Sequence, residues 1–170
     1  AVGMCAGSGS GGSHNADLGF KAGYDSWGNY NVNIGWCAGS GGSGHRCNVS
    51  VGGAAGKSLT YGGDFNTFLG FGAGCNVTTG DRNIAIGQNV QLPSATGDDQ
   101  LAIGYGTNRW ITGIGQTSVT IAGIATVYHA TGIVSATKFC GDGSALTGIS
   151  ASGGGCLKLV ESTNFVTDGV

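Results

Sequence analysis

Apolar and polar positions repeat along the first 109 residues of the chain, at intervals of 16 to 18 residues. In each copy an aliphatic residue stands directly before a glycine, and a second small or apolar residue usually stands two positions earlier. Residues two apart in a strand point to the same face, so each copy predicts a short β-strand. The repeated aliphatics, which we expect to form the core, are Val2, Leu18, Ile34, Val51, Leu69, Ile86 and Ile103.

An amide side chain stands three positions before the aliphatic in every copy after the first. The six amides are Asn15, Asn31, Asn48, Asn66, Asn83 and Gln100. Asparagines stacked in register can pass side-chain hydrogen bonds from one copy to the next, as amide ladders do in parallel β-stacks. We therefore expect these six residues to form a structural ladder. A segment rich in Gly with Ser, Asn or Asp precedes the amides and predicts a turn.

Each copy is interpreted as one coil, with a turn, the amide, a short strand, a second short strand containing a buried Ala, and a turn back. A single coil cannot bury its apolar side, so consecutive coils must stack to share a core. The repeat predicts an all-β fold, a parallel β-roll or β-solenoid with about seven coils of 16 to 18 residues. Because such a core is thin, the stack leaves an apolar face that further chains can cover.

Three segments follow from this pattern. Residues 1–109 form the β-roll, residues 110–135 a β-rich neck, and residues 136–170 a shaft module. The neck is predicted from strand-like stretches at residues 118–123 and 125–128. Because the chain starts within the repeat and stops without a closing element, we expect a segment of a longer protein in which the shaft continues.

Composition narrows the classes of protein that fit. Of 170 residues, 37 are Gly and 9% are charged, whereas average glycine usage is about 7%. Glycine disfavours helices, and a single Pro without a three-residue glycine period excludes collagen. The regularly placed hydrophobic residues, 40% of the chain, argue against disorder. A net charge of −2 predicts no nucleic-acid partner, and the absence of any run near 20 apolar residues predicts no membrane insertion.

Two stretches of the chain resemble known fibrous proteins. Residues 68–113, FLGFGAGCNVTTGDRNIAIGQNVQLPSATGDDQLAIGYGTNRWITG, resemble repeats in tail fibres of tailed bacteriophages, especially cyanophage-like ones, and head domains of trimeric autotransporter adhesins. Residues 136–149, ATKFCGDGSALTGI, resemble a module of phage fibres. The resemblance implies a homotrimer of left-handed parallel β-rolls in a virion or outside a cell. Its implied partners are copies of itself, other fibre or tail proteins, and host surface glycans or a receptor.

The favoured function is structural, in a bacteriophage tail fibre segment that spaces and presents host-recognition elements and whose variable turns can contact host surface glycans. An alternative is a microbial cell-surface adhesin or an extracellular appendage filament of the same architecture. A fibre-borne glycan depolymerase is less favoured, because such enzymes usually need paired carboxylates in a groove and the few acidic residues here fall in turns. We predict no enzymatic activity, no catalytic residue, no cofactor and no metal.

The stretch VGGAAGKS, from Val51 to Ser58, resembles a phosphate-binding loop only superficially. Such a loop needs Gly, four residues and then Gly-Lys-Ser, and the position of the first Gly is occupied by Val51. The stretch is instead the fourth copy of the repeat, and its lysine is incidental.

The cysteines and histidines leave several alternatives open. Cys37, His45 and Cys47 have a loose zinc-like spacing but lack a CxxC pair, so zinc is a minor alternative. Cys5 and Cys37 share a column two coils apart, about 9.6 Å, which is too far for a disulfide. Small buried apolar residues are the favoured interpretation of the cysteines, followed by interchain bridges. The three histidines, which are His14, His45 and His129, are expected on the surface.

Other polar and aromatic residues have both a structural and a functional interpretation. Asp98, Asp99 and Asp142 are expected to form turns, with Ca²⁺ as a minor alternative. The sequons at Asn48 and Asn76 are formal glycosylation sites, although a ladder amide is a poor acceptor. Seven aromatics form either a carbohydrate-stacking surface or part of fibre cores or chain interfaces, and the second interpretation is at least as well supported. They are Trp27, Trp36, Trp110, Tyr24, Tyr30, Tyr61 and Tyr105.

Overall fold

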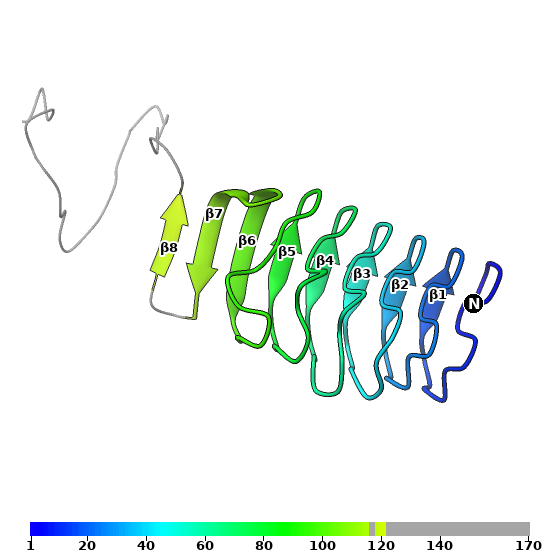
Figure 1. Cartoon of the computed structure of the whole chain (residues 1–170). Helices are drawn as coiled ribbons and strands as arrows, with labels where there is room; N and C mark the ends of the chain where they lie inside the picture. The colour runs from blue at the N-terminus through cyan, green and yellow to red at the C-terminus, as the bar shows by residue number, and fades with distance from the viewer. Residues whose placement is uncertain (116–117, 122–170) are drawn as a thin grey trace, which may run out of the picture. The chain divides into compact units, whose positions relative to one another are not determined.

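The structure, a computed structural model, describes residues 1–115 and 118–121, all within the first of two compact units, Ala1–Thr126. These residues form eight β-strands and no helix (Figure 1). The strands are β1 Ala16–Leu18, β2 Val32–Ile34, β3 Val49–Val51, β4 Thr67–Leu69, β5 Ile84–Ile86, β6 Gln100–Tyr105, β7 Asn108–Ile114 and β8 Ser118–Ile121.

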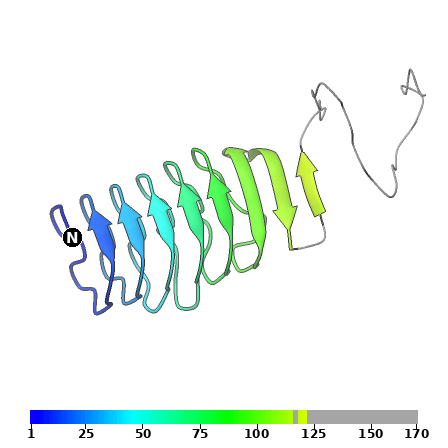
Figure 2. The ribbon, with the colours of Figure 1, turned by 180° about the vertical axis from the view of Figure 1, so that it is seen from behind.

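The first six strands are parallel, and each pairs with the next one along the chain. Val2 adds one more parallel bridge, to Leu18, before β1. The chain therefore winds through five turns between β1 and β6, with one strand in each turn (Figures 1 and 2). The predicted all-β parallel solenoid with a repeat near 17 residues is confirmed.

The corners of the coils are built from residues with left-handed backbone. Lys21 and Cys37, for example, have φ of 54° and 51° at equivalent positions of two successive coils. The backbone N–H of Cys37 donates to the carbonyl of Phe20 at 2.9 Å, one coil back. This segment therefore stacks as a ladder of turns, and the prediction of a second strand in each coil is wrong. The buried alanines expected there are present, and Ala22 and Ala38 are both 0% exposed.

The glycine after each aliphatic has a steric reason. Gly19 has φ of +131°, and a Cβ added to it would lie 2.7 Å from the carbonyl oxygen of Gly35 in the next coil. L-residues rarely adopt this backbone conformation, and the coils approach too closely for any side chain. The aliphatic-Gly pair therefore marks the corner at which the strand ends.

The core lies behind the middle residue of each strand. Successive strand residues point to opposite faces, so a three-residue strand buries its middle side chain when its ends face outward. The inward column is Asp17, Asn33, Ser50, Phe68, Ala85 and Ala102, all at most 7% exposed. Outside the strands, Leu59, Val77, Val90 and Leu92 complete the apolar part of this core.

The expectation that the repeated aliphatics form the core is wrong for the single chain. Val2, Leu18 and Leu69 are 66%, 48% and 47% exposed, and Ile34 is 37% exposed. The remaining three, Val51, Ile86 and Ile103, are half-buried. The sequence predicts the alternation of strand residues correctly but assigns the core to the wrong face of the sheet, because the inward residues of the first three strands are polar.

The parallel stack ends where the chain reverses direction. β7 pairs antiparallel with β6, and β8 pairs antiparallel with β7. The boundary predicted at residue 109 thus falls inside β7, and the strand-like stretch beginning at Ser118 is β8. The rest of the predicted neck, residues 122–135, and the shaft module, residues 136–170, lie outside the described residues.

Candidate functional site

The outer face of the sheet carries a continuous row of aliphatic side chains. Residues directly opposite each other in paired strands lie on the same face of a sheet. The pairing connects Val2, Leu18, Ile34, Val51, Leu69, Ile86, Ile103, Ile111 and Ile121. The seven repeated aliphatics therefore share one row, which β7 and β8 extend by two isoleucines.

A second row runs parallel to the first on the same face. It connects Ala16, Val32, Val49, Thr67, Ile84, Leu101, Gly113 and Val119. Val49, Ile84 and Val119 are among its exposed members. Neither row contains a charged residue, and all of their side chains except Thr67 and Gly113 are apolar; we call these two rows the aliphatic face.

The six predicted amides lie on the inside of the corner where each strand begins. The Oδ1 atom of each Asn accepts a hydrogen bond from the backbone N–H of the amide residue in the next coil. The five links join Asn15 to Asn31, Asn31 to Asn48, Asn48 to Asn66, Asn66 to Asn83 and Asn83 to Gln100, at 2.7 to 3.0 Å. The ladder is thus mainly from side chain to backbone.

The amide nitrogens close the same corner from the other side. Nδ2 of Asn48 donates to the carbonyl of Gly63 at 2.8 Å, and Nδ2 of Asn66 donates to that of Gly80 at 2.9 Å. Both asparagines are 0% exposed. Since each amide satisfies two backbone groups of the neighbouring coil, the ladder is a structural feature and not a binding site.

A second ladder of acceptors stands two positions before the amides, and the sequence analysis did not recognise it. Oδ1 of Asp64 accepts a hydrogen bond from the backbone N–H of Arg46. In the same way Oδ1 of Asp81 accepts from the backbone N–H of Asp64, and Oδ1 of Asp98 accepts from the backbone N–H of Asp81. Asn29 does the same for the N–H of Ser13. The signal was present in the sequence as Asn or Asp at these four positions, but turn formation was a sufficient explanation for each residue alone.

Arg82 compensates the charge of the acidic end of this second ladder. Its guanidinium lies 2.7 Å from Asp99 Oδ1, 3.4 Å from Asp98 Oδ2 and 3.8 Å from Asp81 Oδ2. The hydrogen bond between Arg82 and Asp99 lowers the pKa of the carboxyl and raises the pKa of the guanidinium. Asp98 and Asp99 therefore lie in an ion-pair network on the turn surface.

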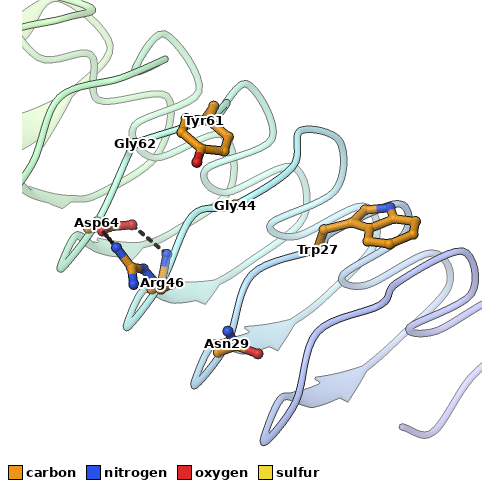
Figure 3. Close-up of a pocket in the computed structure, with 7 residues that line it drawn as sticks. All are labelled: Trp27, Asn29, Gly44, Arg46, Tyr61, Gly62 and Asp64. Atoms are coloured by element: carbon orange, nitrogen blue, oxygen red, sulfur yellow. Dashed lines mark hydrogen bonds and ion pairs between the residues drawn. The ribbon is translucent and has the colours of Figure 1, made fainter.

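A shallow open groove of about 260 Å³ lies on the turn surface (Figure 3). Its side-chain lining is Trp27, Asn29, Arg46, Tyr61 and Asp64, with Gly44 and Gly62 between them. Tyr61 is 79% and Trp27 60% exposed. Among the described residues, this is where predicted aromatics and polar turn residues gather; Trp36, Trp110, Tyr30 and Tyr105 are exposed elsewhere.

His45 is buried, which corrects the expectation of a surface residue. It is 0% exposed, with Nε2 3.2 Å from Ser26 Oγ and Nδ1 3.4 Å from Asn48 Nδ2. Burial lowers the pKa of its imidazole, and the charge of Asp64 opposes that effect more weakly. His14 is exposed and stacks on Tyr30, with ring centroids 4.8 Å apart, and His129 lies outside the described residues.

The described cysteines are free thiols and are not core residues. Cys5 is exposed, and Cys37, Cys47 and Cys75 are half-buried, so the interpretation as buried apolar residues is wrong. Within residues 1–115 and 118–121 no group of three or more His, Cys, Asp or Glu side chains is placed to hold a metal ion. Cys140, Cys156 and Asp142 lie outside these ranges.

The other candidate motifs are part of the stack. The stretch VGGAAGKS begins at the end of β3 and continues into the turn, where Lys57 is exposed. Asn76 pairs with the backbone of Leu92, donating to its carbonyl at 2.9 Å and accepting from its N–H at 3.1 Å. Both sequon amides are therefore engaged in hydrogen bonds between coils.

The fold and these surfaces define a parallel β-solenoid with an uncovered aliphatic face. Comparisons of the chain with protein-family profiles, with curated proteins and with solved structures found no match. The resemblance to fibre repeats thus stays a prediction. No helix in the described part of the chain is long and apolar enough to cross a bilayer.

Proposed function

We propose that this chain is a structural segment of a fibre, of the bacteriophage tail-fibre type, in which three copies pack side by side through the aliphatic face. The segment acts as a spacer that presents host-recognition elements in a virion or outside a cell. Other fibre or tail proteins are its further partners, and the proposal assigns it no catalytic role.

The observation that carries the proposal is the row of nine aliphatics from Val2 to Ile121. At about 4.8 Å per strand, this row extends roughly 38 Å along the stack. An exposed apolar surface of this length is unusual on a monomeric soluble protein and marks an interaction surface. The thin core of the stack gains apolar burial only if this face is covered.

A second copy of the same chain is the partner that fits this face best. Its aliphatics recur at the same strand spacing, so two stacks placed side by side match row against row along their whole length. A three-fold axis that runs along the stacks brings the equivalent aliphatics of three copies together around it. The number three comes from the resemblance to phage fibres and adhesin heads.

Sedimentation equilibrium of the whole chain tests the proposal. We expect a trimer, and we expect Leu69→Glu to shift the population to monomer because a carboxylate would be buried against apolar side chains. Tyr61→Glu is the matched control, since this exposed aromatic lies in a turn away from the strands (Figure 3). A monomeric parent chain, or equal loss of assembly in both variants, would contradict the proposal.

A further inference from the structure

We propose that the groove between Trp27 and Tyr61 binds a neutral glycan chain. The inference rests on the proposed fibre role for its setting, and it assigns a ligand class to one surface of that fibre. The groove lies on the turns, so that packing of copies through the aliphatic face leaves it open to solvent (Figure 3).

Each of the two aromatic rings lies against a glycine of the preceding coil. A Cβ added to Gly11 would lie 2.6 Å from Cε3 of Trp27, and one added to Gly44 would lie 2.7 Å from Cδ2 of Tyr61. Both residues keep most of their surface exposed beside these glycines, 60% for Trp27 and 79% for Tyr61. The C–H face of a sugar ring packs on such an aromatic platform, because both surfaces are apolar while their edges are polar.

The spacing of the platforms suits an extended ligand. Trp27 and Tyr61 occupy equivalent turns two coils apart, and Gly44 occupies the turn between them. At about 4.8 Å per coil, the rings are separated by roughly 10 Å along the stack. A short oligosaccharide spans this distance, so that two of its rings can contact the two aromatic side chains.

The polar groups beside the platforms supply hydrogen bonds without net charge. The guanidinium of Arg46 lies 3.3 Å from Asp64 Oδ2. Oδ1 of Asp64 accepts a hydrogen bond from the backbone N–H of Arg46. The Arg46 side chain lines the groove and is 59% exposed, so solvent reaches it. Asn29 uses Oδ1 for the N–H of Ser13, and its Nδ2 bonds to no other described residue.

This charge balance decides the ligand class. A phosphate or carboxylate ligand would need an uncompensated cation, whereas Asp64 already neutralises Arg46. The Arg46 guanidinium and the Asn29 amide each carry several N–H donors, which can bond to the hydroxyls of a sugar. The groove thus combines hydrogen-bonding groups with two exposed aromatic side chains, which fits neutral hydroxyl-rich rings.

The test is a glycan array carrying neutral and acidic oligosaccharides, probed with the full chain, followed by titration of the best ligand with tryptophan fluorescence and calorimetry. We expect binding to neutral members, and a loss of about tenfold or more in affinity for Trp27→Ala and for Tyr61→Ala. Trp110→Ala is the matched control, because this indole is 61% exposed but lies in β7. The control should bind like the parent.

Gly11→Ala gives a second variant that keeps the indole. Its added methyl group displaces the Trp27 ring, while Gly11 itself has no left-handed backbone, so the fold is retained. We expect weaker glycan binding here too. The inference is overturned if no neutral glycan on the array binds, if acidic glycans or a basic peptide are preferred, or if Trp110→Ala weakens binding as much as Trp27→Ala.

Sedimentation of the same samples separates this inference from the proposed function. A trimer that binds no glycan overturns the groove assignment alone. A monomer that binds neutral glycans through Trp27 and Tyr61 overturns the assembly and leaves the groove assignment standing. Cleavage of the bound glycan would contradict the purely structural role.

Discussion

Oδ1 of Asn48 accepts a hydrogen bond from the backbone N–H of Asn66, one coil farther along, at 2.7 Å. The same relation recurs from Asn66 to Asn83 at 2.9 Å. The N–H groups that donate these bonds are buried in corners, where neither a strand ladder nor water reaches them. The amides therefore act as substitutes for the missing backbone partners.

Replacing one ladder amide should destabilise the stack strongly. Asn66→Ala leaves both the N–H of Asn83 and the carbonyl of Gly80 buried without their partner. At about 1 to 3 kcal/mol for each orphaned group, we expect the free energy of unfolding to fall by roughly 2 to 6 kcal/mol. Urea denaturation measures it. Asn108→Ala, an exposed amide in β7, is the control and should change stability by less than about 0.5 kcal/mol.

The glycines that follow the repeated aliphatics, which we call the glycine column, should tolerate substitution less well than a glycine with a left-handed backbone in open space. Gly70→Ala places a Cβ 2.5 Å from the carbonyl oxygen of Gly87 at φ of +129°, so we expect a loss of about 3 kcal/mol or more. Gly106→Ala has φ of +56° with no atom within 4 Å, and it should lose only about 1 kcal/mol. Thermal unfolding followed by circular dichroism compares the two. Equal losses would show that contact between coils is not the reason for the column.

One serine substitution should stabilise the protein. Ser50 is fully buried, and its Oγ has no hydrogen-bond partner among the described residues. Ala85 and Ala102 occupy the same inward column in later coils, so Ser50→Ala fits the site and removes an unsatisfied hydroxyl. We expect a gain of about 1 kcal/mol in the free energy of unfolding.

Ser26→Ala is the matched control for this substitution. Ser26 is equally buried, but its Oγ bonds to Nε2 of His45. The same chemical change should therefore cost about 1 kcal/mol. If both variants shift the denaturation midpoint in the same direction, the hydrogen-bond argument is wrong.

Much of the fold follows from the sequence because the repeat acts on local backbone geometry. The aliphatic-Gly pair and the amide recur for steric and hydrogen-bonding reasons that every coil shares, as Gly19 and Asn48 illustrate. The direction of the strands was not predictable in the same way. Asp17, Asn33 and Ser50 point inward although they are polar, so hydrophobicity alone assigned the wrong face as the core.

The candidate groove was only partly visible in the sequence. The sequence left open whether Trp27 and Tyr61 lie on a surface or in a core or chain interface, and their common groove depends on turns whose lengths vary from coil to coil. To predict the pairing of Arg46 with Asp64, one must know which turn residues of neighbouring coils lie opposite each other. The repeat length defines this register only to within about one residue. Burial of His45 was missed because its neighbours in the turn are glycines and serines.

The buried imidazole of His45 should make stability depend on pH. Its Nδ1 faces the amide nitrogen of Asn48, which also donates to Gly63, so the ring proton lies on Nε2 toward Ser26. A second proton on Nδ1 would face the N–H of the Asn48 amide, so that two donors would point at each other. Burial also disfavours the charged ring and lowers its pKa below 6.5.

The unfolded chain takes up this proton near pH 6.5 and the folded chain only at lower pH. Stability is therefore retained above about pH 6.5 and falls as the pH drops toward the folded pKa, by at most about 1.4 kcal/mol per unit from this group. Urea denaturation at fixed protein concentration between pH 7.5 and 5 measures the slope. His45→Gln should remove this contribution, whereas His14→Gln, a change at an exposed ring, should keep it. An unchanged slope in His45→Gln would assign the pH dependence to other groups.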